Sequence, residues 1–283
     1  MKIGAMVESF KLGFRGGVEK AASLGVAGVQ KFATGKELEW TDAEIREALD
    51  IVKSNGLVFS AICGDFGYGF HDPARNPEMI EKSKRVMEIA KKLECNIVTT
   101  HVHRMTEEES ESNQIIRAAL EQLGSFAESM DAVYALETGP EIGRVMDGFL
   151  STLNTRGIRV NFDPANLVMC MAERPEEALK YIGKYVVHTH AKDGIRRGVG
   201  PFPGTDTPER AAHNAVFGVK DVPFVEVPLG QGDVNFDTYL PALAAAGYDG
   251  FLTIERECGA TPEADIAMAV SFLKEKVAKF GLN

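Results

Sequence analysis

The chain has 283 residues, and its 45% hydrophobic and 25% charged content is that of an ordinary globular protein rather than a disordered or fibrous one. Its 41 acidic residues exceed its 31 basic ones, and the net charge of −10 disfavours a nucleic-acid partner. The N-terminal residues lack the apolar core of a signal peptide, and no apolar run approaches the roughly 20 residues of a membrane span. We therefore expect a cytoplasmic protein without a membrane partner. The four cysteines show no metal-binding spacing and are expected to be free thiols.

Short runs rich in β-forming residues alternate with longer helical stretches along the whole chain. The predicted strands are 2–8, 27–32, 57–63, 96–102, 132–137, 158–162, 185–190 and 250–255. Each is almost continuously apolar, which is typical of parallel strands that are covered on both faces. The stretches between them carry apolar residues at the helical spacing of three and four. This alternation favours a single domain over residues 1–283, an α/β fold of the (β/α)8 or TIM-barrel type, rather than an open doubly wound sheet.

One segment, 196–227, interrupts this alternation. It is rich in glycine and proline and follows the seventh predicted strand, where a shorter loop is usual. Long loops at the C-terminal face of a TIM barrel commonly act as lids or specificity elements. We therefore predict a lid here, with a surface excursion that has no role as the alternative.

Polar residues stand where four consecutive predicted strands end. They are Glu137, Asp163, His190 and Glu255. Strand ends ring the active-site face of a TIM barrel, so these side chains should converge. Three carboxylates at one mouth repel one another unless a cation lies between them, and this set of ligands suits Mn²⁺, Mg²⁺, Co²⁺ or Zn²⁺. The sequence thus predicts one divalent metal ion, with Mn²⁺ favoured. Taken singly, a glutamate at a strand end could simply meet solvent, and Asp163 could merely start a turn.

Two pairs of histidines alternate along predicted strands, so both members of a pair should face the same way. In VVHTHAKDG we expect His190 at the rim and His188 beneath it, as a buried residue or a hydrogen-bond partner. In THVHR, His101 and His103 could join the metal, orient Glu137 or bind substrate hydroxyls. We favour a polar role other than ligation, because four ligands already hold a site that must stay open for substrate.

Five motifs make the chain resemble the xylose isomerase-like TIM barrels, a superfamily of sugar isomerases and epimerases that also contains endonuclease IV. The motifs are ALETGP around Glu137, NFDPANL around Asp163, HTHAKDG around His190, VPLGQGDVNF at 227–236 and GFLTIERE around Glu255. The resemblance covers essentially all of the predicted βα units. Within the superfamily, the D-tagatose and D-psicose 3-epimerases have the chemistry that matches best.

The resemblance implies roles for individual residues. Glu137 and Glu255 would serve as acid and base as well as metal ligands, on a small-molecule sugar or sugar derivative. The epimerases place a substrate-binding arginine where this chain has Arg196, six residues after the ligand histidine. They also have a histidine three residues after the aspartate, where this chain has Asn166. The residues that we expect to contact substrate are Arg196, His101, His103, Asn166 and His188.

The implied reaction removes a proton from a carbon beside a carbonyl and passes through an enediolate. Return of the proton from the opposite face gives an epimer, and return to the adjacent carbon gives an aldose–ketose isomer. A lyase or deglycosidase on an oxidised sugar or inositol derivative is the alternative, because β-elimination begins with the same step. An endonuclease IV-like nuclease is disfavoured, since its three-zinc cluster needs more histidines, and a non-catalytic sugar-binding barrel is disfavoured by the full set of ligands. A homo-oligomer is compatible with all of these functions.

Overall fold

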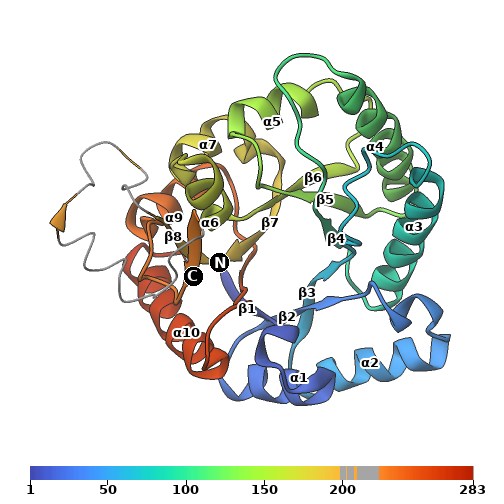
Figure 1. The fold of residues 1–283 in the computed structure, drawn as a ribbon. Coiled ribbons are helices and arrows are strands. Elements are labelled where there is room, and N and C mark those ends of the chain that lie inside the picture. The colour runs from blue at the N-terminus through green and yellow to red at the C-terminus, as the bar shows by residue number, and fades with distance from the viewer. Residues whose placement is uncertain (198–201, 203–206, 209–222, 283) are drawn as a thin grey trace.

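A computed structural model describes residues 1–197, 202, 207–208 and 223–282, and its main feature is a closed barrel of parallel strands (Figure 1). The strand order around the barrel is β1-β10-β7-β6-β5-β4-β3-β2. These strands are β1 (Lys2–Met6), β2 (Gly28–Phe32), β3 (Val58–Cys63), β4 (Ile97–Thr100), β5 (Val133–Glu137), β6 (Ile158–Phe162), β7 (Val186–Ala191) and β10 (Phe251–Ile254). The predicted TIM barrel is confirmed.

Helices connect the strands and form the outer layer of the barrel (Figure 1). The main ones are α1 (Gly13–Ser23), α2 (Asp42–Ser54), α3 (Asn76–Lys92), α4 (Glu111–Ser129), α5 (Gly143–Leu150), α7 (Pro175–Ile182), α9 (Phe236–Ala245) and α10 (Pro262–Lys279). After β6 the chain first makes two short turns, α6 (Pro164–Asn166) and the π-helical η3 (Leu167–Met171), and then enters α7. No helix in the described part of the chain has the length and apolar character needed to cross a membrane.

The strands are buried because side chains fill the barrel on one face and helices cover the other. In β5, for example, Tyr134 to Glu137 are all buried. Phe162 at the end of β6 stacks on Tyr239 of α9, with ring centroids 5.6 Å apart. The Tyr239 hydroxyl also lies 2.6 Å from Thr189 Oγ1 in β7. These contacts hold the ends of β6 and β7 against the outer layer. Of the predicted metal ligands, Asp163 directly follows β6 and His190 follows Thr189 in β7.

The strands β1 and β4 each end two residues earlier than the apolar pattern predicts. β1 ends at Met6, and Glu8 begins a 3-10 turn, η1 (Glu8–Phe10). β4 ends at Thr100, which pairs with Leu136, and the chain then turns so that His103 N–H donates to the Gly69 carbonyl. The prediction of a strand over 96–102 was therefore too long. His101 and His103 lie in the loop after β4, and the alternation expected for a strand does not apply to them.

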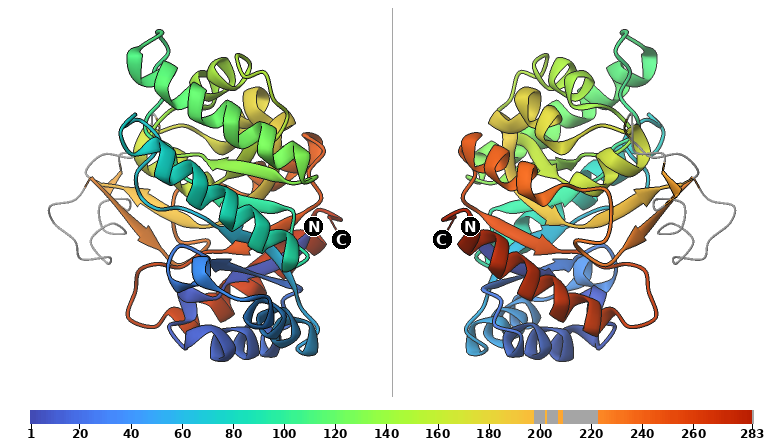
Figure 2. Two further views of the ribbon diagram at one scale, coloured as in Figure 1. Left: turned by 90° about the vertical axis from the view of Figure 1, so that its right-hand side faces the viewer. Right: turned by 90° about the vertical axis from the view of Figure 1, so that its left-hand side faces the viewer.

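The segment predicted as one long loop has ordered ends. β8 (Asp193–Arg196) and β9 (Phe224–Val227) form an antiparallel pair in which Asp193 pairs with Val227 and Arg196 with Phe224. This hairpin extends from the end of the barrel opposite both termini (Figure 2). The carboxyl ends of the barrel strands are at the same end. Most of the predicted lid, residues 198–201, 203–206 and 209–222, lies outside the described residues.

Asp193 anchors the loop that follows the hairpin. Its carboxylate is buried and accepts hydrogen bonds from the backbone N–H groups of Gly194, Gly230, Gly232 and Val234. A Cβ atom at Gly232 would lie only 2.1 Å from Asp193 Oδ1, so the loop needs glycine there. This contact explains the motif VPLGQGDVNF in structural terms: its glycines let the backbone close around one carboxylate.

Asp193→Ala is expected to lower the free energy of unfolding by about 3 kcal/mol, because several buried N–H groups lose their acceptor and each unpaired group costs roughly 1–3 kcal/mol. Urea denaturation in the presence of EDTA would measure this without a contribution from bound metal. Asp50→Ala, which removes an exposed carboxylate from α2, is the matched control and should change stability by less than about 0.5 kcal/mol. Equal stability of the two variants would contradict the anchoring role.

Candidate metal centre and active site

The four predicted ligands converge at the carboxyl ends of neighbouring strands. Glu137 is the last residue of β5, Asp163 directly follows β6, His190 lies in β7, and Glu255 directly follows β10. One ligand atom from each lies within 4.8 Å of the others, and all four side chains are buried. The structure thus brings together the four residues that were predicted to converge from their positions at strand ends.

The centre of this cluster offers atoms that have no other partner. His190 Nδ1 lies 3.4 Å from Glu137 Oε1, 3.7 Å from Asp163 Oδ2 and 3.3 Å from Glu255 Oε2. His190 Nδ1 and Asp163 Oδ2 are both buried and make no hydrogen bond. Buried polar atoms without a partner are uncommon, and a ligand or ion is one way to satisfy them. One nitrogen and three carboxylates around such a point fit a divalent cation.

The electrostatics of the cluster favour a positive charge at its centre. Burial opposes protonation of His190, but the negative charges of Glu255 and Glu137 raise the pKa of its imidazole well above the ordinary value. Burial opposes ionisation of Glu255, yet the charges of His190 and Lys192 lower the pKa of this carboxyl to about 2. Burial raises the pKa of Asp163. A divalent cation among these groups would supply positive charge in place of the proton on His190.

Gln30 of β2 orients the ligand histidine. Gln30 Nε2 donates to Thr99 Oγ1 over 3.0 Å, which leaves Gln30 Oε1 to accept from His190 Nε2, also over 3.0 Å. In the neutral ring this assigns the proton to Nε2, which leaves the lone pair on Nδ1 for a cation among the three carboxylates. Sequence reasoning missed this residue. The available signal was a glutamine inside the apolar run AGVQKF, fully buried in the structure.

Glu137 is held by two amides. Asn161 Nδ2 donates to Glu137 Oε2 over 2.9 Å, and Asn166 Nδ2 donates to Glu137 Oε1 over 3.2 Å. Burial opposes the ionisation of Glu137, but the charges of His190 and His101 hold its pKa well below the ordinary value. Asn166 therefore lies beside the site, as predicted. Asn161 also contacts Glu137, and sequence reasoning did not single it out.

His188 lies beneath His190, as expected, with ring centroids 5.6 Å apart. Its Nδ1 lies 2.8 Å from Asn161 Oδ1 and its Nε2 lies 2.9 Å from Thr253 Oγ1. Burial and the charge of His190 lower the pKa of His188 to about 3, so the ring is neutral. With both nitrogens bonded inside the barrel, His188 is placed to position Asn161, and through it Glu137, rather than to reach substrate.

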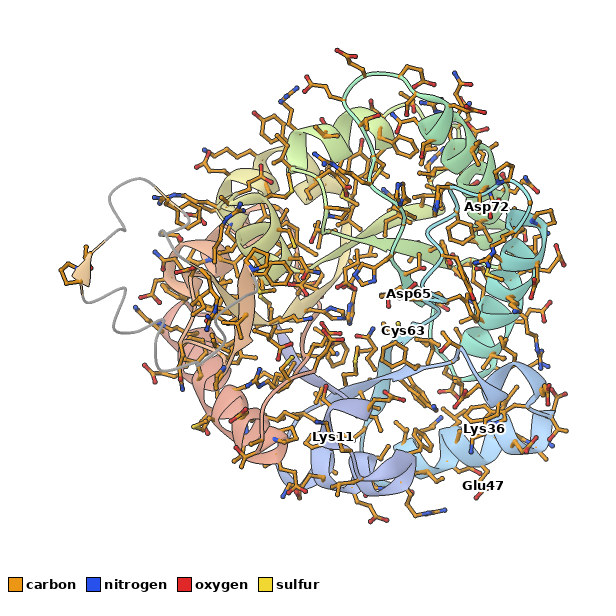
Figure 3. All side chains as sticks on the ribbon, in the orientation of Figure 1. Lys11, Lys36, Glu47, Cys63, Asp65 and Asp72 are labelled. Carbon is orange, nitrogen blue, oxygen red and sulfur yellow. The ribbon has the colours of Figure 1, made fainter. Side chains whose placement is uncertain are left out.

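The two histidines of the other pair, His101 and His103, have different surroundings. His101 Nδ1 lies 2.9 Å from Asp65 Oδ2, and its Nε2 lies 3.3 Å from Glu137 Oε1. Asp65 and Cys63 lie toward the barrel centre, whereas Glu47 lies on the outer edge (Figure 3). The charge of Glu137 raises the pKa of His101 to about 11. His103 is exposed and stacks on His71, with centroids 4.1 Å apart, so the structure does not bring it to the four ligands.

Two basic residues follow His190 along the chain. Lys192, which is buried, donates from Nζ to Glu255 Oε2 over 2.8 Å and to Glu257 Oε2 over 2.6 Å. Sequence reasoning assigned no role to Lys192, although it lies two residues after His190. Arg196 Nη1 donates to the Cys170 carbonyl over 3.0 Å, which places its guanidinium against η3. Contact between Arg196 and substrate stays a prediction.

A cavity of about 270 Å³ opens over the cluster. It is lined by Phe32, Cys63, Asp65, His101, Glu137, Asn166, His190, Lys192, Glu255 and Glu257. Most of these side chains are polar or charged, which suits a ligand with many hydroxyl groups. Three of the four candidate ligands, Glu137, His190 and Glu255, therefore border a space in which a small polar molecule could lie.

Comparison with known families agrees with the barrel. The sequence profile described as xylose isomerase-like TIM barrel matches residues 18–276. The chain belongs to this family. The search of curated proteins finds no match.

Proteins with solved structures share the fold over nearly the whole chain. A xylose isomerase domain protein from Planctomyces limnophilus is 24% identical, with a TM-score of 0.79 over 98% of this chain and 97% of that chain. A D-tagatose 3-epimerase-like protein is 17% identical, with a TM-score of 0.75 over 98% and 97%. The probable 3-DHS dehydratase from Bacillus anthracis is 17% identical, with a TM-score of 0.74 over 97% and 99%. At these identities the likeness supports the shared fold alone.

Proposed function

We propose that this chain is a divalent-metal-dependent sugar isomerase or epimerase. The observation that carries the proposal is the pair Glu137 and Glu255, whose oxygens lie 3.4 and 3.3 Å from His190 Nδ1 at the base of a polar cavity. Two carboxylates around one point can remove a proton from a substrate carbon and return it. Membership of the xylose isomerase-like family, together with a D-tagatose 3-epimerase-like protein among the structural neighbours, supports the assignment.

Glu137, Asp163, His190 and Glu255 would hold the ion, and their one nitrogen and three carboxylates favour Mn²⁺, with Mg²⁺, Co²⁺ and Zn²⁺ as alternatives. When bound, the ion would polarise the substrate carbonyl and so make the neighbouring C–H more acidic. Glu137 and Glu255 would then take up and return the proton at a carboxylate oxygen. Asn161 and Asn166 hold the Glu137 carboxylate in place, and Lys192 does the same for Glu255.

The two glutamates have different neighbours, and this difference suits unequal roles. Glu137 accepts from two neutral amides and faces His101 across 3.3 Å. Glu255 accepts from the Lys192 ammonium. Cytoplasmic location, self-association and the contacts of His101, Asn166 and Arg196 with substrate belong to the same proposal and rest on the sequence.

Solvent exchange tests the proposed reaction. The Mn²⁺-loaded protein is expected to introduce one deuterium from D₂O at the carbon beside the carbonyl of D-fructose or D-tagatose, and the EDTA-treated protein is not. NMR follows both the exchange and the formation of an epimer or an aldose. Exchange that persists at full rate after metal removal, or no exchange in any ketose of a full ketohexose panel, would count against the proposal.

A lyase on an oxidised sugar is the second candidate, and the dehydratase among the structural neighbours favours it. Its first step is the same proton abstraction, but a leaving group then departs from the next carbon. The product would be an unsaturated ketone with a new ultraviolet absorption. The same NMR and absorbance assays therefore separate the two reactions.

A further inference from the structure

The β8–β9 hairpin contacts the segments that follow two other strands of the candidate metal centre. Its first strand, β8, is bonded to η3, in the connection that begins at Asp163. Arg196 Nη1 donates to the Cys170 carbonyl over 3.0 Å. Gly194 packs so closely on Met169 that a Cβ atom would lie 2.2 Å from the Met169 sulfur. The hairpin is therefore fixed on one side against the chain that follows a candidate ligand.

On the other side, β9 is bonded to the segment that begins at Glu255. The buried carboxylate of Glu226 in β9 accepts from Glu257 N–H over 3.1 Å and from Cys258 N–H over 3.4 Å. It also accepts from Arg256 Nη1. These N–H groups lie beyond the end of β10, where the strand ladder has stopped. The carboxylate of the hairpin thus takes the place of a strand partner for the residues next to Glu255.

Glu226 also faces the side chain of Glu255 through Lys192. Lys192 Nζ lies 2.8 Å from Glu255 Oε2 and 3.8 Å from Glu226 Oε2. Glu255 Oε2 is the same oxygen that lies 3.3 Å from His190 Nδ1. All four side chains are buried, and salt screens buried charges only weakly. A displacement of β9 would therefore alter both the backbone and the charges around this candidate ligand.

The bonds of Arg256 allow β9 to leave its place without unfolding the barrel. Arg256 Nε donates to Asp265 Oδ2 of α10 over 2.9 Å, so the arginine keeps a buried partner when Glu226 moves away. Lys192 likewise keeps Glu255 and Glu257. No buried cation would be left unpaired, which is the costly outcome of breaking an ion pair in a protein interior. Docked and undocked hairpins are thus two accessible arrangements of one barrel.

We propose that Glu226 is a positioning residue of the metal centre, and that docking of β9 through Glu226 and binding of a divalent ion at the four candidate ligands strengthen each other. The inference rests on the metal dependence in the proposed function. If docking places Glu255 for the ion, the bound ion must favour docking by the same factor, because coupling between two equilibria is reciprocal.

Hydrogen exchange in the unaltered protein tests the coupling. Amide exchange in β9 is to be compared by mass spectrometry in the EDTA-treated and the Mn²⁺-loaded protein. Mn²⁺ should slow exchange in Phe224–Val227 by at least about fivefold, the low end of typical coupling factors. Exchange in α2 (Asp42–Ser54), which has no residue at the metal centre, is the internal reference and should not change. Equal exchange of β9 in the two states would overturn the inference.

Two alanine variants separate positioning from a loss of stability. Glu226→Ala and Asp265→Ala each remove one buried carboxylate partner of Arg256, but only Glu226 belongs to the hairpin. Glu226→Ala should raise the Kd for Mn²⁺ in calorimetric titration by at least about fivefold and abolish the protection of β9 by Mn²⁺. Asp265→Ala should lower the melting temperature and keep the wild-type Kd and protection. Equal effects of the two variants on Mn²⁺ binding would overturn the inference.

A conservative variant tests whether the N–H bonds carry the effect. Glu226→Gln keeps an oxygen that can accept from Glu257 and Cys258 N–H, so it should restore most of the affinity and protection lost in Glu226→Ala. A glutamine variant as weak as the alanine variant would show that the charge of Glu226 acts instead of its docking bonds, and would overturn the positioning role.

The same samples separate this inference from the proposed function. Coupling of Mn²⁺ to β9 without deuterium exchange in any ketohexose would contradict the proposed reaction and keep the positioning role. Metal-dependent exchange of a ketohexose with a hairpin that does not respond to Mn²⁺ would do the reverse. No binding of Mn²⁺ to the wild-type protein would overturn both.

Discussion

Asp163→Asn is expected to weaken binding of a divalent ion by at least roughly 100-fold, because even loss of an outer hydrogen-bond partner of a ligand typically costs about 10–100-fold in metal affinity. The substitution removes one of three negative charges and places an amide N–H₂ or a weaker oxygen donor where Asp163 Oδ2 faces His190 Nδ1. Calorimetric titration of the metal-free protein with Mn²⁺ would measure the change, with metal content after dialysis as a second readout.

Asparagine is a better test than alanine because Asp163 has a second role. Its Oδ1 accepts from the backbone N–H groups of Ala165 and Asn166 and so caps the short turn α6. Asparagine keeps that oxygen, whereas alanine would also lose the cap, at a cost of about 1 kcal/mol. Glu257→Gln is the control, since it removes a carboxylate from the same cavity that bonds to Lys192 and to none of the four ligands. Full metal affinity in Asp163→Asn would contradict the ligand assignment.

The barrel and its four candidate ligands could be predicted because both depend on order along the chain. Apolar runs alternate with helical stretches, and in parallel strands every carboxyl end lies at one face of the barrel. Glu137, Asp163, His190 and Glu255 stand at or directly after such ends, so no knowledge of long-range contacts was needed to bring them together. In the closed barrel, the carboxyl end of each strand lies beside that of the neighbouring strand, which brings these residues together.

The remaining features depend on contacts that a single sequence does not encode locally. β8 and β9 pair across a long separation, and no two-residue turn signal marks their hairpin. Gln30 bonds to His190 and Lys192 bonds to Glu255, and only the closed barrel brings the two members of each pair together. His103 was misplaced for a related reason: the apolar pattern continues past Thr100, but strand pairing stops there.

Glu137→Gln and Glu255→Gln are each expected to lower kcat by roughly 10³-fold or more, because glutamine keeps a ligating oxygen but cannot accept the substrate proton. The structure makes Glu255→Gln the cleaner variant. Its amide can turn its oxygen toward Lys192 Nζ. Glu137 accepts from Asn161 at one oxygen and from Asn166 at the other, so an amide N–H₂ there must face a donor. Metal titration and thermal unfolding should therefore accompany both variants.

Solvent exchange in these two variants distinguishes an epimerase from an isomerase. In an epimerase that works on two opposite faces, the surviving glutamate can still remove and return the proton on its own face, so one variant should exchange the substrate's α-proton with D₂O without forming product. An isomerase that moves the proton with one base would lose exchange and product together when that base is changed. If both variants turn over near the wild-type rate, the acid–base assignment is wrong. His101, whose Nε2 lies 3.3 Å from Glu137 Oε1, would then be the next residue to test, ahead of the exposed His103.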